Sequence, residues 1–189
     1  FPVPPRPWLP PAIRWSPTGP REGEAVGLRV LQPEAGRGAV DVEGEIDGRP
    51  VHFTRVDGGW FGVAAAPIGS AGPAALELRF LLSPDSTAVE RTTLEIGARE
   101  FPATRLSVAP RFSDPDPEAL ARIREERRLV RATLARATEE WLPRGAFRWP
   151  RETRITSPFG QRRLFNGELR SRHTGVDLAG RRGAPVLAA

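Results

Sequence analysis

The chemistry that this chain could support is concentrated in its last segment, from Arg154 to Ala189. There His173 and Asp177 stand four residues apart, and Gly175 between them allows the backbone to turn both side chains toward one point. Neutral imidazole and carboxylate oxygen are ligands that zinc takes in catalytic sites, where three protein ligands leave one position open for water. His173 and Asp177 therefore provide two of the three ligands of a candidate zinc site.

Each of these residues also has a simpler explanation. His173 could be an exposed loop histidine, and Asp177 could be a carboxylate that caps a turn. The chain has only two histidines and no cysteine, so any metal site must combine histidine with carboxylates. The other histidine, His52, stands in a strand-like run without a ligand pattern, and we expect it to be a surface or partly packed residue.

Further motifs surround the candidate pair in a fixed order. They are Ser157-Pro158-Phe159-Gly160, Arg163 with Phe165-Asn166-Gly167, His173-x-Gly175-x-Asp177, and Gly183-x-Pro185-Val186-x-Ala188. As a set these motifs resemble the lysostaphin/LytM-type zinc metallopeptidases, hydrolases that cleave peptide cross-links in bacterial cell walls. With these motifs around them, we favour the ligand role of His173 and Asp177 over the simpler explanations.

The resemblance implies a zinc endopeptidase that acts on peptidoglycan in the periplasm or outside the cell, with Zn2+ held by His173 and Asp177. In the family the third ligand and a catalytic histidine come from a His-x-His motif, which we expect beyond Ala189. We therefore expect no catalytic residue within the 189 residues, and we predict that they are inactive alone. The alternative is a catalytically inactive LytM-like scaffold that binds the cell wall or activates an amidase.

Three residues are candidates for substrate binding. Asn166 is the only asparagine of the chain, and an Asn-Gly pair favours a turn with positive φ, so a turn role explains it without function. The resemblance places this loop near the binding groove, which makes substrate contact the alternative. Arg162 and Arg163 could hold carboxylates of a peptide substrate through bidentate pairs.

The net charge of +5 is located in the same segment, where seven arginines accompany only Glu168 and Asp177. Such a surface could attract an anionic polymer, either wall material with carboxylates or nucleic acid. We do not expect nucleic acid as a partner, because the one strongly helical segment carries acidic and basic residues in nearly equal number. No apolar run approaches the length of a membrane span, so we expect no transmembrane segment.

The rest of the chain is predicted to be mainly β. Residues 1–11 hold six prolines and indicate a Pro-rich leader. Over 12–110, short alternating apolar runs separated by turn signals such as Asp47-Gly48 predict an immunoglobulin-like β-sandwich of about seven strands. The expected strands lie around Val26–Val30, Val40–Ile46, Val51–Phe53, Leu76–Leu82, Leu94–Ile96 and Leu106–Val108.

One long linker helix is predicted over 114–142. Asp116 is a suitable N-cap before Pro117 at the first helical position, and Pro143 with Gly145 would end the helix. Its apolar residues fall on one face, which must pack on something, and we expect the helix to connect the sandwich to the peptidase domain. Residues 146–189 are then the incomplete, N-terminal part of an antiparallel β peptidase domain. The apolar face comprises Leu120, Ile123, Val130, Leu134, Ala137 and Trp141.

Overall fold

The computed structural model describes residues 7–33, 38–109, 115–136 and 145–188. These residues are mainly β-strand, as predicted, with a single α-helix among them. The chain forms two compact units, Phe1–Arg99 and Glu100–Ala189. Within the described residues, no helix is both long enough and apolar enough to cross a membrane.

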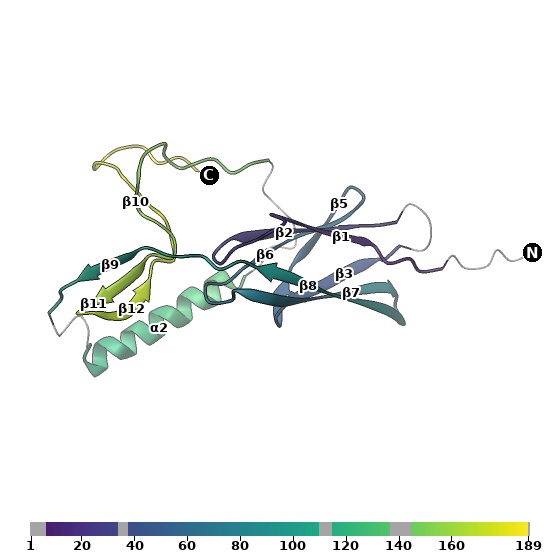
Figure 1. The fold of residues 1–189 in the computed structure, drawn as a ribbon, viewed down its shortest axis with the longest axis horizontal. Coiled ribbons are helices and arrows are strands. Elements are labelled where there is room, and N and C mark those ends of the chain that lie inside the picture. The colour runs from purple at the N-terminus through teal and green to yellow at the C-terminus, as the bar shows by residue number, and fades with distance from the viewer. Residues whose placement is uncertain (1–6, 34–37, 110–114, 137–144, 189) are drawn as a thin grey trace, which may run out of the picture. The chain divides into compact units, whose positions relative to one another are not determined.

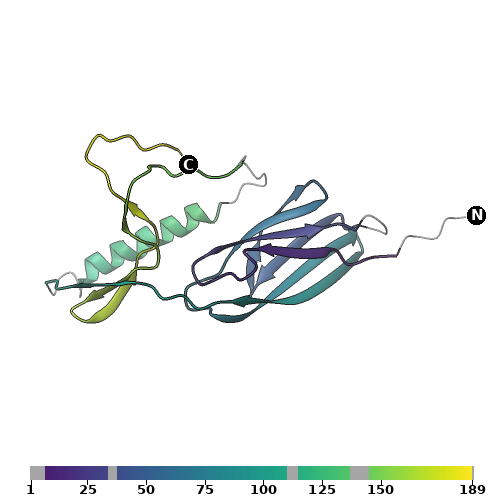
Figure 2. The ribbon, with the colours of Figure 1, turned by 45° about the horizontal axis from the view of Figure 1, so that its top comes forward.

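Unit 1 is a sandwich of two four-stranded antiparallel sheets (Figures 1 and 2). The strand orders β1-β2-β6-β5 and β4-β3-β7-β8 correspond to A-B-E-D and C′-C-F-G of an immunoglobulin-like sandwich, which confirms the predicted architecture. The strands are β1 Ala12–Ser16, β2 Ala25–Leu31, β3 Asp41–Ile46, β4 Arg49–Val51, β5 Phe53–Val56, β6 Gly59–Ala65, β7 Gly72–Ser83 and β8 Ser86–Ile96.

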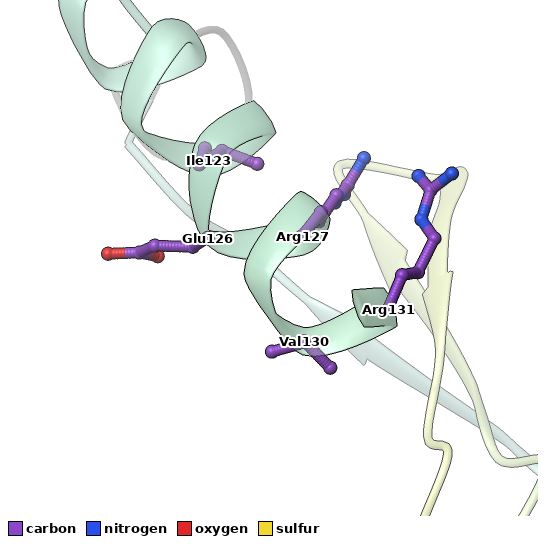
Figure 3. A pocket seen from close by; sticks show the side chains of 5 residues that line it. All are labelled: Ile123, Glu126, Arg127, Val130 and Arg131. Carbon is purple, nitrogen blue, oxygen red and sulfur yellow. The ribbon is translucent and has the colours of Figure 1, made fainter. Parts of the chain in front are cut away.

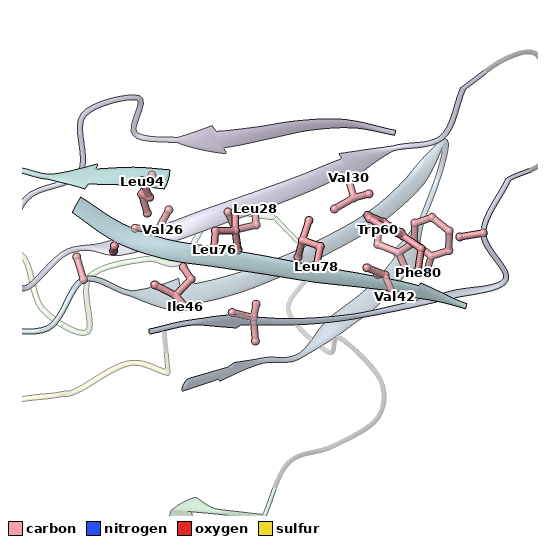
Figure 4. Packing of buried hydrophobic residues seen from close by; sticks show 14 of the residues in the cluster. Val26, Leu28, Val30, Val42, Ile46, Trp60, Leu76, Leu78, Phe80 and Leu94 are labelled. Atoms are coloured by element: carbon pink, nitrogen blue, oxygen red, sulfur yellow. The ribbon is translucent and has the colours of Figure 1, made fainter. Parts of the chain in front are cut away.

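The core of the sandwich lies between the inner faces of its two sheets (Figure 4). Alternate residues of β2 and β7 point inward, because successive side chains of a strand face opposite sides. Trp60 and Phe80 are the largest fully buried side chains. The inward residues of β2 and β7 include Val26, Leu28, Val30, Leu76, Leu78 and Phe80.

The turn between β3 and β4 has the predicted form. Asp47 and Gly48 both have positive φ, 47° and 72°, and Ile46 pairs with Arg49 across them. A two-residue turn with positive φ at both positions matches the twist of a β-hairpin. This Asp-Gly pair therefore sets the register of the hairpin.

The boundaries of the sandwich differ from the prediction at both ends. The predicted leader over 1–11 is too long, because the Trp8 ring lies 5.5 Å from the Phe80 ring and packs against the core. The predicted end at 110 is also wrong, since Arg99 is the last residue of unit 1. The strand expected around Leu106 exists as β9 (Ala103–Leu106), but it pairs with a strand of unit 2.

Inside the sandwich, Val51 and Phe53 do not share one strand as predicted. Val51 ends β4 in one sheet and Phe53 begins β5 in the other, so His52 is the point at which the chain changes sheets. His52 is exposed there, which agrees with the expectation of a surface histidine.

The described residues of unit 2 form two small sheets. β11 (Arg162–Phe165) and β12 (Glu168–Arg172) form an antiparallel hairpin, and β9 lies parallel to β11 on its other side. β10 (Ile155–Ser157) pairs antiparallel with β13 (Asp177–Leu178). The predicted antiparallel β arrangement of residues 146–189 is present, and β9 adds a parallel strand from before the helix.

The helix α2 spans Pro117–Leu134, shorter than the predicted 114–142. Asp116 caps it as predicted, with its carboxylate accepting a hydrogen bond from the Ala119 amide at 2.8 Å. Ala135 caps the other end, and the predicted face residues Ala137 and Trp141 lie outside the described residues. The sequence has no glycine or proline that would stop the helix before Pro143, which is why it predicts a longer one.

No residue of α2 is buried, so the packing expected for its apolar face is not found within the described part of the chain. Of the residues of this face, Leu134 is 80% exposed and Val130 55%. Helices in proteins gain most of their stability from tertiary packing, and an unpacked helix is easily shortened at its end. The described residues that line a groove on α2 all belong to this helix: Ile123, Glu126, Arg127, Val130 and Arg131 (Figure 3).

Candidate metal site

Backbone hydrogen bonds hold His173 against the turn that begins at Ser157. The His173 amide donates to the carbonyl of Gln161 at 2.9 Å, and the His173 carbonyl accepts from the amide of Gly160 at 2.8 Å. These bonds extend the β11–β12 ladder by one residue beyond Arg172, the last residue of β12. Asp177 begins β13 and pairs with Ser157 of β10, so both ends of the motif loop are fixed to one segment.

The structure brings the two predicted ligands together. The His173 Nε2 atom lies 3.2 Å from Asp177 Oδ1, with the His173 side chain 13% exposed and the Asp177 side chain 55% exposed. Zinc bonds to nitrogen and oxygen are about 2.0–2.2 Å long, which places two ligand atoms of one tetrahedral ion roughly 3.3 Å apart. The separation of Nε2 and Oδ1 therefore fits two ligands of a single metal ion.

The other ring nitrogen of His173 faces oxygen atoms. Its Nδ1 lies 3.1 Å from the Pro158 carbonyl oxygen and 3.0 Å from the Ser157 hydroxyl oxygen. A carbonyl oxygen can only accept, so Nδ1 must carry a hydrogen, and the lone pair of neutral imidazole is then on Nε2.

This assignment leaves Nε2 facing a carboxylate oxygen that is also an acceptor. Two acceptors at 3.2 Å are compatible only if a cation lies between them or if the imidazole is protonated. A metal ion held between the two atoms and a protonated imidazole paired with the carboxylate are both consistent with this geometry, and the donor set is one that zinc takes. Among the described residues, no group of three or more His, Cys, Asp or Glu side chains could hold a metal ion, so this part of the chain supplies no third ligand.

A close contact fixes the turn next to the pair. Gly160 is buried with φ of 78°, and a Cβ atom there would lie 2.1 Å from Cδ1 of Phe101. Phe101 is itself buried, and the guanidinium of Arg172 lies 5.6 Å from the centre of its ring. Only glycine fits this position, which explains one residue of the Ser-Pro-Phe-Gly motif.

Asn166, a candidate for substrate binding, lies in the turn between β11 and β12. Its φ is 51° and that of Gly167 is 93°, which is the conformation expected for the turn role. Its side-chain amide bonds the backbone of Val108 twice, with Oδ1 accepting from N and Nδ2 donating to O, both at 3.2 Å. These bonds attach the hairpin turn to the segment after β9, and the substrate role of Asn166 stays a prediction.

The strand register separates the other two candidates, Arg162 and Arg163. Neighbouring residues of a strand point to opposite faces of the sheet. Arg163 pairs with Ser171 and with Thr104, which puts it on the face that also carries Gln161 and His173. Arg162 pairs with Arg172 on the other face, so of the two only Arg163 shares a face with the candidate site.

The sequence alone assigns no role at the site to Ser157, Gln161 and Thr104, although Ser157 stands in one of the motifs. Ser157 and Gln161 belong to the motif segment, where their polar side chains were a usable signal. Thr104 has no such signal, because it stands in a strand pattern far from the motif and reaches the site only through the parallel pairing of β9 with β11.

In comparisons with known proteins, neither a family model nor a curated protein sequence matches the chain. The resemblance of residues 154–189 to a peptidase family therefore depends on the motif residues themselves.

Proposed function

We propose that the protein is a zinc metalloendopeptidase that cleaves peptide cross-links of bacterial peptidoglycan. The observation that supports the proposal is the 3.2 Å separation of His173 Nε2 and Asp177 Oδ1, with the opposite nitrogen of the ring held by the Pro158 carbonyl. His173 and Asp177 would hold the metal. The third ligand would come from a His-x-His motif, which the 189 residues do not contain.

A bound zinc ion would lower the pKa of a coordinated water toward neutrality and polarise the carbonyl of a scissile peptide bond. The burial and orientation of His173 and Asp177 suit this chemistry. His173 is largely buried and presents Nε2 in a fixed direction, whereas Asp177 is more than half exposed. The exposed side of the pair leaves access for water and for a peptide.

The charge of this segment agrees with an acidic polymer as substrate. Seven arginines lie between Arg154 and Ala189, and Arg163 shares the sheet face of His173. Guanidinium groups bind carboxylates in bidentate geometry, and peptidoglycan peptides carry carboxylates. We therefore propose peptidoglycan as the partner and the cell envelope, either periplasmic or extracellular, as the location.

The proposal is tested on the full-length protein. Bound zinc per chain and the release of peptides from purified peptidoglycan are measured for His173→Ala, Asp177→Ala and His52→Ala. Each of the first two removes one ligand, and we expect zinc content and turnover to fall to background. His52→Ala is the matched control, because it removes the only other histidine from an exposed position of unit 1 and should leave both values unchanged.

Two outcomes would decide against parts of the proposal. If Asp177→Ala keeps both its zinc and its turnover, the metal site is wrongly assigned. If the unmodified protein sediments with peptidoglycan but releases no peptide with zinc present, the catalytically inactive scaffold is the better description.

A further inference from the structure

We propose that α2 is an association helix, which pairs with α2 of a second copy of the protein as a parallel two-stranded coiled coil. Within the described part of the chain no residue of α2 is buried, so its apolar stripe is open to a partner. The helix contains no residue of the candidate metal site, and the association is therefore independent of the proposed function.

The stripe on α2 has the spacing of a coiled coil. Its members follow one another in alternating steps of three and four residues, which is the a and d pattern of a heptad labelled a to g. A helix that packs on the core of its own domain usually has a wider stripe, with an apolar e or g position as well. Here the e positions are Arg124 and Arg131 and the central g position is Glu126, which leaves a narrow seam. The seam consists of Leu120 (a), Ile123 (d), Arg127 (a), Val130 (d) and Leu134 (a).

The groove on α2 has the composition of a coiled-coil packing site (Figure 3). In a parallel coiled coil, a side chain at position a inserts into a hole made by d, g, a and d residues of the facing helix. On α2 these four are Ile123, Glu126, Arg127 and Val130, and all of them line the groove. The side chain that enters it would be Arg127 of the second copy. Its aliphatic stem can lie over the apolar residues while its guanidinium reaches Glu126.

The charges beside the seam favour the parallel orientation. In a parallel pair, a g residue faces the e residue of the next heptad on the other helix. Glu126 then faces Arg131 of the second copy, and the two-fold symmetry forms this ion pair twice. In an antiparallel pair e faces e, which would place arginine opposite arginine. Glu126 already accepts a hydrogen bond from Arg122 of its own helix at 2.8 Å, but a carboxylate can accept several, so both contacts can exist together.

Arg127 limits the size and strength of the assembly. A single polar residue at an a position specifies the register and the number of strands, at a cost in stability. The described seam is also short, and short helices are marginal without a partner. We therefore expect a dimer that dissociates on dilution and whose helices gain stability when it forms.

The first experiment measures the association of the whole protein by sedimentation equilibrium over a range of concentrations. The unmodified protein should show a monomer–dimer equilibrium. Val130→Gln places an amide in the seam of both copies and should weaken the dimer by about 10-fold or more. Leu129→Gln is the matched control, because Leu129 is 61% exposed at a c position outside the seam and should leave the equilibrium unchanged. Arg127→Leu removes the polar residue from the seam and should strengthen the dimer.

A charge exchange tests the partner contact itself. Glu126→Arg and Arg131→Glu each turn two attractive contacts into repulsive ones, and each should weaken its own dimer by about 10-fold. In an equimolar mixture of the two variants, every g residue faces an e residue of opposite charge on the other chain. The mixture should therefore associate more tightly than either variant alone.

A cross-linking experiment tests the orientation. The chain has no cysteine, so a single introduced thiol can form a disulfide only with a second copy. In a parallel pair, position 120 lies opposite position 120 of the second copy, whereas position 129 lies on the outer side of each helix. With oxidised glutathione as the oxidant, Leu120→Cys should form a disulfide-linked dimer much faster than Leu129→Cys.

The inference is overturned if the unmodified protein stays monomeric at every concentration, or if Val130→Gln and Leu129→Gln change its association equally. A monomer in which Val130→Gln raises amide exchange along α2 more than Leu129→Gln does would show that the stripe packs on another part of the same chain. Equal cross-linking of Leu120→Cys and Leu129→Cys would refute the parallel pair. Loss of the proposed peptidase function would leave all of these measurements as they are.

Discussion

Replacing Gly160 by alanine should destabilise unit 2 through a single contact. The new Cβ atom would lie 2.1 Å from Cδ1 and 2.3 Å from Cε1 of Phe101, closer than any two such atoms can approach. The ring of Phe101 is buried against Gly160 on one side and contacts Arg172, so it cannot move freely away. The backbone must shift instead, and with it the Gly160 amide that holds the carbonyl of His173.

The loss of stability expected for Gly160→Ala has two contributions. An alanine in the left-handed region costs about 1–2 kcal/mol relative to glycine. Forcing an extra carbon atom into a filled space costs about 1–3 kcal/mol more. Together they predict a loss of about 2–5 kcal/mol in the stability of the β11–β12 hairpin. Gly167→Ala is the matched control, because φ is also positive there, at 93°, and nothing lies within 4 Å of the added carbon.

Native-state hydrogen exchange at the amides of β11 and β12 measures this stability without interference from unit 1. Gly167→Ala should lower the free energy of opening by only the cost of placing alanine in the left-handed region, about 1–2 kcal/mol. The double variant Gly160→Ala, Phe101→Ala should recover part of the difference, since it removes the ring. Equal losses for Gly160→Ala and Gly167→Ala would show that the contact with Phe101 has no energetic weight, and would refute the reasoning.

Two other perturbations test the sandwich and the helix. Leu78→Ala removes a fully buried side chain of β7 and should lower the free energy of unfolding of unit 1, measured with urea, by about 2–5 kcal/mol. Val63→Ala, at an exposed position of β6, should lower it by less than about 1 kcal/mol. Similar losses for the two variants would contradict the assigned core. On α2, the hydrogen bond from Arg128 lowers the pKa of Glu125. Because the folded-state pKa is below the unfolded one, the contribution of this pair is present above the unfolded pKa and is lost as the pH falls through the folded value. The helical 13Cα shifts around Glu125 should therefore decrease in that acidic range, and Glu125→Gln should remove the dependence; an identical acid response in both proteins would argue against the pair.

The features that could be predicted from sequence are those fixed by neighbouring residues. The inward alternation of Val26, Leu28 and Val30, and the hairpin turn at Asp47-Gly48, follow from local patterns and appear in the structure. The sequence does not predict β6, because it contains Gly59, Gly62 and several alanines. With so few large apolar side chains besides Trp60, the alternation of apolar and polar residues typical of a strand is not visible.

Errors arose where the answer depends on distant residues. The strand at Leu106 was expected in the sandwich, but a strand pattern does not specify its partner, and here the partner is β11, which lies with β9 in unit 2. The same limit applies to the candidate site. The proximity of His173 and Asp177 follows from their spacing, whereas the contact of Gln161 with Thr104 depends on a parallel pairing that no short motif encodes.

The separation of β9 from β11 in the sequence also has a consequence during synthesis. β9 follows the sandwich directly, but Gln161 emerges 57 residues after Thr104. At about 5–20 residues per second, the ribosome needs roughly 3 to 11 s to deliver this stretch. For that time β9 is a short, unpaired edge, and the charge of Arg105 and the preceding Pro102 help to keep other strands from pairing with it. The sandwich can fold early in translation, whereas His173 reaches its final orientation only after the strands of unit 2 have emerged and paired.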